Sequence, residues 1–421
     1  MEYGLIGGRL EHSFSQPIHE QLCPGIDYRL CPLPEERQAR EFLEAGEFSG
    51  INVTIPYKQV AMEYCSHLDA AAQAIGAVNT VVRRGGELYG YNTDYAGFLY
   101  MARRAGVEFR GKNVLILGTG ATSLTVHAAV THEGAAHVHH ASRSGAHGAL
   151  TYRQAAQQGG GVDVIVNTTP AGMYPDVDRS AVELQDYPSL CAVLDVVYNP
   201  MRTELLQQAA QRGVAHSDGL PMLVAQAFYA QEHFQGRKLD ETLLERVLRA
   251  IRADRANLVL VGMPSSGKSS VGRACARLLG KQFVDVDREI ERQAGRPIRD
   301  ILQPGNEEPF RELESQVTAR IARECGQVIA TGGGAVLRPE NVRRLRRNGV
   351  VLFLDRPLEL LKAGGGRPLS QTRQALEEQY RARLPLYQAA CHARVENSGV
   401  FDRAAEKARE AFYEVLDSEW A

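Results

Sequence analysis

The sequence has no excess of either charge and no long apolar run. Among its 421 residues, 48 Lys and Arg face 50 Asp and Glu, which gives a formal net charge of -2. Such a chain has no general affinity for a polyanion, which argues against nucleic acid as the main partner. The longest apolar stretches, such as 113–117 and 350–354, fall far short of the roughly 20 residues that span a bilayer, so no membrane partner is expected.

The sequence also lacks the pattern of an export signal, and its cysteines lack the pattern of a disulfide framework or a metal site. Its first residues, MEYGLIG, predict a strand and not a basic segment followed by an apolar one. The seven cysteines are scattered, odd in number and without the spacing of a metal site. We therefore expect a cytoplasmic protein with reduced thiols, whose oligomeric state the sequence leaves open.

Short apolar runs instead alternate with longer amphipathic stretches along the whole chain, which is typical of parallel sheets covered by helices. The predicted fold class is α/β throughout. Two different glycine-rich loops, at Gly118 and Gly262, each follow a strand and open a new series of strands and helices, so two nucleotide sites and two catalytic units are expected. No Gly/Ser-rich spacer separates the halves, and an apolar stripe over 240–253 predicts a helix at their junction.

The first glycine-rich loop has the context of a dinucleotide site. The predicted strand 113–117 leads into Gly118, Gly120 and Ala121, and a helix to about residue 133 follows. Because a helix start presents free N–H groups, this order of elements favours a bound pyrophosphate. The third glycine of the usual fingerprint is absent, so the loop alone is equally compatible with a plain tight turn.

The next predicted strand, 136–141, ends at the position where dinucleotide-binding folds carry the residue that contacts the ribose. Ser142, Arg143 and Ser144 follow it. An arginine flanked by hydroxyls suits a 2′-phosphate, whereas an acidic residue would bind a free 2′-hydroxyl. The sequence therefore favours NADP over NAD, and a solvated surface arginine is the alternative.

Seven further motifs occur in order over residues 1 to about 240. They are HSFSQ at 12–16, NVTIPYK at 52–58, GAVNT at 76–80, GYNTD at 90–94, NTTPAGM at 167–173, DVVYNP at 195–200 and DGLPMLVAQ at 218–226. Together with the glycine loop, this series resembles the shikimate dehydrogenase family. The resemblance implies a substrate-binding lobe over 1–94, completed by 219–238, and an NADP-binding Rossmann-type domain over 95–218.

The same resemblance assigns the residues of a reductase site. Reduction of a ketone leaves charge on its oxygen, so a proton donor must lie beside it, and Lys58 is the candidate with Asp94 as its partner. Substrate contacts are implied for Ser13, Ser15, Thr54, Asn79, Tyr198 and Gln226, and approach to the nicotinamide for Gly219 and Met222. Gln16, Tyr91 and Ser142 depart from the family's usual Pro, Asp and Asn, which puts loop geometry and cofactor affinity in question but not the reaction type.

The second glycine-rich loop, GMPSSGKSS at 262–270, fits the phosphate-loop pattern GxxxxGK[ST] between a predicted strand and a predicted helix. Its Gly262, Gly267 and Ser270 are predicted to cradle the phosphates of ATP. Lys268 would neutralise charge on the transferred group, and the Ser269 hydroxyl would coordinate Mg²⁺.

Acids and arginines that follow this loop indicate the acceptor of the phosphoryl group. Asp285 and Asp287 lie at i and i+2 after an apolar run, and a strand would point both to one face. Arg311 offers a guanidinium suited to a carboxylate. The remaining candidates are Gly333 and Gly334 after a strand, with Arg367 and Arg383 farther on.

This second set resembles shikimate kinase over about 257–400. The resemblance implies Asp285 near Mg²⁺, Asp287 on the acceptor hydroxyl, Arg311 and Arg383 on the substrate carboxylate, Gly333 and Gly334 on the substrate, and Arg367 on the ATP phosphates. The segment 361–369 is shorter and richer in glycine than the family's lid, with Lys362 roughly where arginine is common.

The resulting prediction is a bifunctional enzyme with a helical linker over 239–256 and a kinase domain over 257–421. NADPH would reduce 3-dehydroshikimate to shikimate, and ATP with Mg²⁺ would phosphorylate its 3-hydroxyl. One alternative is a quinate-type dehydrogenase fused to a kinase of other specificity. Another is a ligand-sensing regulator without catalysis, which the presence of Lys58, Asp94, Lys268, Ser269 and Asp287 disfavours.

Overall fold

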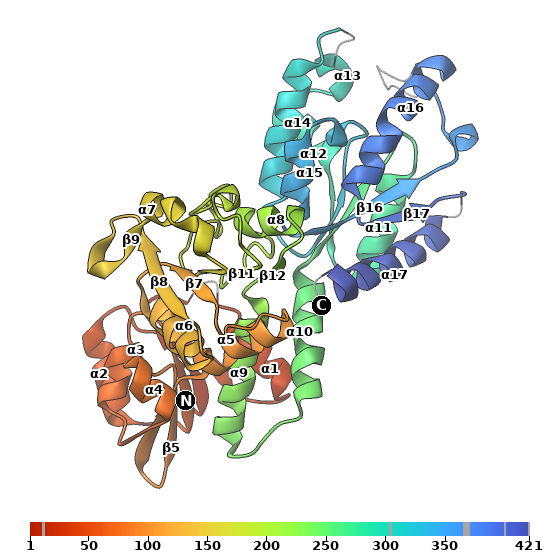
Figure 1. Ribbon diagram of the computed structural model, residues 1–421. Helices are drawn as coiled ribbons and strands as arrows, with labels where there is room; N and C mark the ends of the chain where they lie inside the picture. The colour runs from red at the N-terminus through yellow and green to blue at the C-terminus, as the bar shows by residue number, and fades with distance from the viewer. Residues whose placement is uncertain (11–12, 303–304, 365–370, 400, 420–421) are drawn as a thin grey trace. The chain divides into compact units, whose positions relative to one another are not determined.

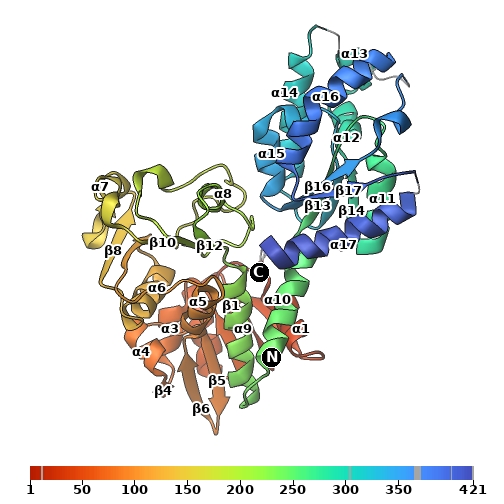
Figure 2. The same ribbon diagram turned by 45° about the vertical axis from the view of Figure 1, so that its right-hand side comes forward.

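The computed structural model describes residues 1–10, 13–302, 305–364, 371–399 and 401–419 (Figures 1 and 2). The chain divides into two compact units, Met1–Ile251 and Arg252–Ala421. Both consist of largely parallel sheets covered by helices, so the predicted α/β class is confirmed. Among the helices of the described segments, none combines the length and the apolar character needed to cross a membrane.

The first sheet of the first unit has the strand order β2-β1-β3-β5-β6-β4, with antiparallel pairing of β5 to β3 and to β6. Its strands are β1 (Tyr3–Gly7), β2 (Tyr28–Pro32), β3 (Gly50–Val53), β4 (His67–Leu68), β5 (Thr80–Arg84) and β6 (Glu87–Tyr91). Its helices are α1 (Ser15–Leu22), α2 (Glu36–Ala45), α3 (Lys58–Glu63) and α4 (Ala70–Ile75). On one face Ile51 packs against Leu43 of α2 and Ala61 of α3.

The second sheet of this unit is parallel, in the order β12-β11-β10-β7-β8-β9. Its strands are β7 (Asn113–Leu117), β8 (His137–Ser142), β9 (Leu150–Thr151), β10 (Val164–Asn167), β11 (Ala192–Asp195) and β12 (Ala215–Ser217). Its helices are α6 (Ala121–His132), α7 (Tyr152–Gln157) and α8 (Glu204–Gln211), with the 3-10 turns η1 (Ala146–Gly148), η2 (Gly159–Gly161) and η3 (Leu184–Asp186). Counted from β7, this is the 3-2-1-4-5-6 order of dinucleotide-binding folds, whose ligand crevice lies at the carboxyl ends of the strands.

Two long helices connect the sheets of the first unit. The helix α5 (Thr93–Arg104) packs its Phe98 and Met101 under the second sheet, and α9 (Leu220–Gln235) packs its Phe234 on the first. The backbones of α5 and α9 approach closely at Gly97, where a Cβ atom would lie 2.7 Å from the carbonyl oxygen of Met222. The two sheets are therefore held in one compact unit.

The predicted junction helix is α10 (Glu241–Arg255). Its stripe of Leu244, Val247, Leu248 and Ile251 is buried against α1 and α9 of the first unit. At roughly 1.5–3 kcal/mol for each such side chain, this burial anchors that stretch of the helix to the first unit.

The second unit contains a parallel sheet in the order β14-β15-β13-β16-β17. Its strands are β13 (Asn257–Val261), β14 (Gln282–Asp285), β15 (Gln327–Ala330), β16 (Gly349–Asp355) and β17 (Ala393–Glu396). Its helices and turns are α11 (Lys268–Leu279), α12 (Val286–Ala294), α13 (Ile298–Ile301), α14 (Glu308–Ile321), η4 (Ala335–Leu337), α15 (Pro339–Arg346), η5 (Leu358–Leu360), α16 (Arg373–Ala390) and α17 (Phe401–Glu419). The phosphate loop connects the central strand β13 to α11, and a large core packs Val259 and Val351 against Val317 of α14.

Candidate active sites

A cavity of about 640 Å³, the first cavity, opens in the first unit and is lined by residues that follow strands of both its sheets. Two of its side chains form an ion pair, in which the Nζ atom of Lys58 lies 2.5 Å from Oδ2 of Asp94. Each side chain is 16% exposed. Because an ammonium group has three N–H donors, the pair leaves Lys58 able to donate to a ligand in the cavity.

A buried network fixes Asp94 in place. Asp94 lies in the first turn of α5, and the side-chain oxygen of Asn79 accepts a hydrogen bond of 2.7 Å from the N–H of the preceding Thr93. Asn52 in turn donates to the hydroxyl of Thr80 at 3.0 Å. These satisfied and buried polar groups hold the start of α5 against β3 and β5, so the carboxylate is positioned before any ligand binds.

The structure brings the substrate and nicotinamide residues that the sequence analysis predicted to the lining of the first cavity. They are Ser13, Ser15, Thr54, Asn79, Tyr198, Gln226, Gly219 and Met222. These residues lie on segments that are remote in the chain, and the packing of α1 and α5 on α9 brings them together. The grouping makes one pocket with many hydrogen-bonding groups beside the Lys58–Asp94 pair.

A fully buried aspartate fixes the loop that carries Tyr198. Asp195 accepts hydrogen bonds from the Val197 N–H at 3.0 Å and from the Thr203 hydroxyl at 2.7 Å. Burial raises the pKa of Asp195 to about 7, and these donors act in the opposite direction. The Val197 carbonyl accepts from the N–H of Gly219, so Asp195 indirectly ties two sides of the cavity together.

The predicted pyrophosphate loop lies at the carboxyl end of β7. Gly118 has a φ of 114°, and a Cβ atom there would lie 2.6 Å from the Thr168 hydroxyl, so this turn requires glycine. The ring Nδ1–H of His140 donates to the Gly118 carbonyl at 3.2 Å. Gly120 is the N-cap of α6, which begins at Ala121, and the N–H groups of such a first turn have no acceptor within the helix.

Ser142 is the last residue of β8, the strand next to β7, and Arg143 and Ser144 follow it. Arg143 is exposed and forms no ion pair with any other residue that the structure describes. The hydroxyl oxygens of Ser142 and Ser144 accept from the N–H groups of Gly145 and Ala146, so they shape the turn that presents Arg143. This turn and the residues Gly118, Gly120 and Ala121 lie outside the described lining of the first cavity.

Sequence reasoning missed Arg9 in the first cavity. This arginine is exposed, lines the cavity with Ser13 and Ser15, and forms no ion pair with another described residue. A cation beside hydroxyl groups is suited to an anionic ligand group. Its position two residues after β1 and four before Ser13 was the available signal.

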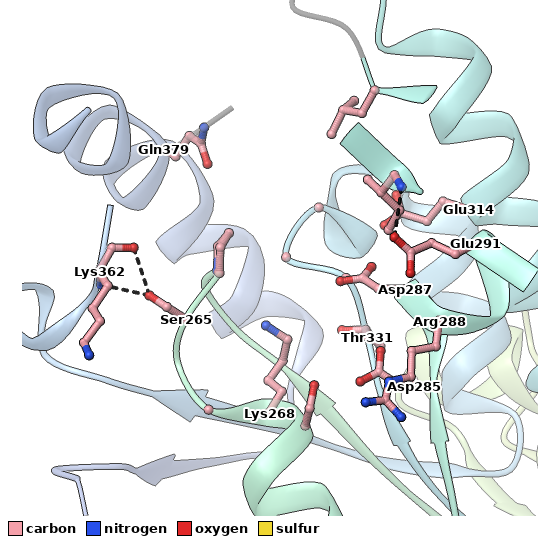
Figure 3. Close-up of a pocket in the computed structure, with 18 of the residues that line it drawn as sticks. Ser265, Lys268, Asp285, Asp287, Arg288, Glu291, Glu314, Thr331, Lys362 and Gln379 are labelled. Carbon is pink, nitrogen blue, oxygen red and sulfur yellow. Dashed lines mark hydrogen bonds between the residues drawn. The ribbon is translucent and has the colours of Figure 1, made fainter. Parts of the chain in front are cut away.

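The second unit contains a cavity of about 760 Å³, the second cavity, at the phosphate loop (Figure 3). Lys268 is the first residue of α11, and its Nζ atom donates to the carbonyl oxygens of Gly262 at 2.8 Å and Met263 at 2.9 Å. Ser269 and Ser270 line the cavity in the first turn of the same helix. Neutral carbonyl oxygens bind an ammonium more weakly than phosphate oxygens do, so Lys268 can transfer to a phosphate.

The strand that was expected to carry both Asp285 and Asp287 ends earlier than predicted. Asp285 is the last residue of β14, and α12 begins at Val286, so the alternation of a strand does not relate the two acids. Both nevertheless line the second cavity, because the strand end and the first helical turn meet there. Burial raises the pKa of Asp287 to about 6; nearby Lys268 lowers it, and the charges of Asp285 and Glu314 add to the rise.

Arg311 of α14 is buried at the wall of the second cavity. Its Nη1 atom donates to Oε2 of Glu314 at 2.7 Å, one helical turn away. A Cβ atom at Gly334 would lie 2.1 Å from this Nη1, so a side chain at this position would displace the guanidinium. Burial raises the pKa of Glu314, and Arg311 opposes that rise.

Arg383 and Tyr387 of α16 contact the loop that contains Gly333 and Gly334. The Arg383 Nη1 atom donates to the Gly333 carbonyl at 3.1 Å, and the Tyr387 hydroxyl donates to the same oxygen at 2.5 Å. Residues four apart share one face of a helix, which is why both meet this carbonyl. The cavity thus has two buried guanidinium groups at its wall.

The structure places most of the predicted kinase residues at one cavity. The lining includes Gly267, Lys268, Ser269, Ser270, Asp285, Asp287, Arg311, Gly333, Gly334 and Arg383. Gly262 contacts Lys268 but lies outside the described lining. Arg367, predicted to bind the ATP phosphates, lies outside the described residues, as does most of the segment 361–369.

Sequence reasoning also missed Glu314 and Ser265 in this cavity. The spacing of Glu314 three residues after Arg311 was a usable signal, because opposite charges at i and i+3 pair on a helix. Ser265 gave no such signal, since its partner is 97 residues away.

Comparison with protein families gives two matches that divide the chain. Residues 5–81 match the family model described as the shikimate dehydrogenase substrate binding domain. Residues 264–417 match the family model described as shikimate kinase. The first match contains Lys58 and the second contains Lys268.

Relatives of the N-terminal part include a shikimate dehydrogenase (NADP(+)) of Clostridium beijerinckii. It is 33% identical over 258 residues, which is 58% of this chain and 95% of the relative. The remaining part of this chain lies beyond the length of that relative.

Two solved structures of dehydrogenases also match only part of this chain. Shikimate 5-dehydrogenase from Thermus thermophilus, in complex with NADP(H) and shikimate, has a TM-score of 0.53 and 27% identity over 59% of this chain and 99% of that chain. Quinate dehydrogenase from Corynebacterium glutamicum, in complex with NAD, has a TM-score of 0.54 and 28% identity over 60% of this chain and 98% of that chain.

Proposed function

The chain belongs to the shikimate dehydrogenase family over its N-terminal part and carries a shikimate kinase domain in its C-terminal part, and from this premise we propose what its two cavities do. The first reduces 3-dehydroshikimate to shikimate with NADPH. The second phosphorylates the 3-hydroxyl of shikimate with ATP. The observation that carries this proposal is that each unit has its own cavity, with a lysine and an aspartate in its lining.

In the first cavity, Lys58 is the proton donor. Reduction of the ketone places developing negative charge on its oxygen, and an ammonium group in contact with that oxygen stabilises the charge and delivers a proton. Asp94, 2.5 Å away, keeps the ammonium oriented and can accept a hydroxyl proton of the substrate. The nicotinamide cofactor supplies the hydride when it is bound.

The substrate carboxylate is held by the hydroxyl groups in the lining of the first cavity. Ser13 and Ser15 supply hydroxyl donors, and the Ser13 hydroxyl oxygen already accepts from the Ser15 N–H at 3.2 Å. Arg9 lies in the same lining and adds a positive charge. We include Arg9 in the carboxylate site because charge-assisted hydrogen bonds are stronger than those of neutral hydroxyls.

The fit of the Rossmann-type sheet to NADP(H) rests on two features. The start of α6 after Gly120 offers free N–H groups to a pyrophosphate. Arg143 is exposed, without an ion-pair partner among the described residues, at the end of the adjacent strand, where its guanidinium can bind a 2′-phosphate. These features support NADPH as the preferred reductant.

In the second cavity, Asp287 accepts the proton of the attacking hydroxyl. A carboxyl group with a pKa of about 6 is ionised at neutral pH and still basic enough for this transfer. Lys268 binds the transferred phosphoryl group after it exchanges its loop carbonyls for phosphate oxygens. Arg311 and Arg383 hold the substrate carboxylate at the cavity wall.

The residues present also fit Mg²⁺. The Ser269 hydroxyl and the Asp285 carboxylate are hard oxygen donors that line the same cavity as Lys268. We propose that these two residues hold the ion, which when bound neutralises charge on the phosphates. The close-up shows Asp285 and Lys268 among the residues that line this cavity (Figure 3).

Oxidation of quinate is the second candidate for the first cavity. The similarity to a quinate dehydrogenase structure favours it, and that structure was solved with NAD. Arg143 suits NADP and so argues against the cofactor of that structure. Comparison of kcat/KM for shikimate and quinate oxidation, with each cofactor, decides between the two.

We further propose that the domains follow the boundaries expected from the sequence, with the substrate lobe over 1–94 and 219–238, the cofactor domain over 95–218, and the kinase domain after the helical linker. All seven cysteines are free thiols, which supports a cytoplasmic location.

A coupled assay tests the proposed function. The full chain is incubated with 3-dehydroshikimate, NADPH, ATP and Mg²⁺, and the products are identified by mass. We expect shikimate 3-phosphate with all components, shikimate alone without ATP, and no product without NADPH. Accumulation of shikimate in the presence of ATP would contradict the kinase assignment.

A further inference from the structure

The outer end of the phosphate loop has a backbone conformation that its side chain does not favour. Ser265 has a φ of 62°, in the left-handed region. There a residue with a Cβ atom is less stable than glycine by about 1 kcal/mol or more. Gly267, two residues later, also has a positive φ. A serine at position 265 is therefore explained only if its hydroxyl makes a compensating interaction.

The Ser265 hydroxyl makes two hydrogen bonds to one residue of a remote segment. The N–H of Lys362 donates to the Ser265 Oγ atom at 2.9 Å, and this hydroxyl donates to the Lys362 carbonyl oxygen at 3.3 Å (Figure 3). A serine hydroxyl can do both, because it has one donor and two acceptor positions. The two bonds fix the direction of the chain at Lys362 as well as its distance from the loop.

The other side of the loop tip is firmly packed. Pro264 lies against the loop that contains Gly333 and Gly334. The contact is so close that a Cβ atom at Gly333 would be 2.7 Å from the proline ring. The Gly333 carbonyl is itself held by Arg383 and Tyr387. Ser265 thus projects from a fixed base, and the segment at Lys362 is the part that its hydroxyl holds.

Lys362 has the position and charge of a nucleotide-binding residue. The preceding Leu361 is buried and anchors the chain, whereas Lys362 is exposed and lines the second cavity together with Lys268. Lys362 forms no ion pair with any described residue. Figure 3 shows it across the phosphate loop from Asp285 and Asp287, away from the acids. An ammonium group beside the phosphate loop suits an anionic ligand such as a nucleotide.

We propose that Ser265 is a positioning residue of the kinase, whose hydroxyl clamps the backbone at Lys362 to the phosphate loop so that the Lys362 ammonium contacts the nucleotide. This inference rests on the proposed kinase function of the second cavity. The left-handed conformation is needed because it turns the Ser265 side chain outward, toward that segment.

The variant Ser265→Gly tests the clamp. Glycine keeps the backbone conformation without strain and removes the hydroxymethyl side chain, so the fold is retained and reduction of 3-dehydroshikimate by the same chain stays unchanged. Loss of two hydrogen bonds should raise KM for ATP about tenfold and change kcat much less. The dissociation constant of a nonhydrolysable ATP analogue, measured by calorimetry, should rise by a similar factor. Ser265→Ala should show the same binding defect with a lower melting temperature, because alanine keeps the strain.

A double-variant cycle identifies Lys362 as the group through which Ser265 acts. Lys362→Met removes the ammonium, keeps the length of the side chain and should raise KM for ATP by a factor similar to that of Ser265→Gly. If the clamp acts through Lys362, the double variant should be no worse than either single variant, because the same contact is lost only once.

Three results would overturn the clamp. They are an unchanged ATP affinity in Ser265→Gly, an unchanged affinity in Lys362→Met, and defects that multiply in the double variant. Failure of the proposed function is distinguishable from all three. It appears as a wild-type chain that binds the ATP analogue but does not phosphorylate shikimate, whereas the clamp is measured by binding alone.

Discussion

The two lysines of the two cavities differ in their hydrogen-bond partners. Lys58 is paired with the Asp94 carboxylate at 2.5 Å, and Lys268 is bound by two neutral carbonyl oxygens of its own loop. A lysine held by a carboxylate is charged and oriented before the substrate arrives. A lysine held by carbonyls is released when phosphate oxygens offer stronger bonds. The first site is therefore preorganised, and the second is completed by its ligand.

The largest expected effect separates the two sites. Lys58→Ala should lower the rate of reduction by a factor of about 10³ or more and leave phosphorylation within about twofold of wild type, because the proton donor serves only the first cavity. Lys268→Ala should do the opposite. Initial rates of both reactions, measured on each variant, check the prediction. Loss of both activities in either variant would show that the sites are not independent.

The next effect concerns the base of the kinase. Asp287→Asn should lower phosphorylation by a factor of about 10² to 10³, because an amide cannot accept the proton of the attacking hydroxyl. Reduction by the same protein serves as the control and should be unchanged. A variant that phosphorylates shikimate at the wild-type rate would exclude Asp287 as the base.

The same carboxylate predicts the pH dependence of phosphorylation. Burial raises the pKa of Asp287 to about 6, and only the ionised form accepts a proton. The rate should therefore be constant above about pH 7 and fall about tenfold per pH unit below pH 6. A pH profile of kcat/KM for shikimate measures this. A rate that stays constant down to pH 5 would contradict it.

A smaller effect tests the cofactor choice of the preorganised site. Arg143→Gln should raise KM for NADPH about 10- to 100-fold, because a charged contact to the 2′-phosphate is lost, and should leave KM for NADH unchanged. Steady-state kinetics with the two cofactors check this. An equal change of KM for NADPH and for NADH would mean that Arg143 does not contact the 2′-phosphate.

The smallest effect concerns Arg9. Arg9→Gln should raise KM for 3-dehydroshikimate about three- to tenfold, since an exposed cation contributes modestly to the binding of a carboxylate. Arg37→Gln is a matched control, because Arg37 is also exposed and lies on α2, outside the cavity lining. An unchanged KM in Arg9→Gln would remove Arg9 from the carboxylate site.

Much of the fold was predictable from the sequence, because its strands are apolar runs bounded by polar residues or glycine. The strand β7, Asn113–Leu117, was predicted with its limits, and burial on both faces of a parallel sheet explains why such a run stands out. The strand that was predicted to carry both Asp285 and Asp287 ends at Asp285 in the structure. Val286 suits a strand as well as a helix start, so local preference could not locate the boundary between Asp285 and Asp287.

The candidate sites were predictable where residues occur in motifs and not where they depend on remote partners. Lys58 and Asp94 lie in separate motifs, and their contact requires only that the two motifs meet. Arg9 belongs to no motif, and Ser265 occupies a variable position of the phosphate-loop motif. The importance of Ser265 follows from a hydrogen bond to Lys362 across 97 residues, which depends on how the loops pack and not on any local pattern.

The most direct test of two independent sites mixes the two inactive variants. Lys58→Ala and Lys268→Ala proteins are combined in equal amounts with 3-dehydroshikimate, NADPH, ATP and Mg²⁺, and shikimate 3-phosphate is followed by mass. If the two sites are independent and shikimate passes between them through solution, neither variant alone should form shikimate 3-phosphate. The mixture of the two variants should form it. If the mixture forms no shikimate 3-phosphate although each variant keeps its remaining activity, the two sites are not independent.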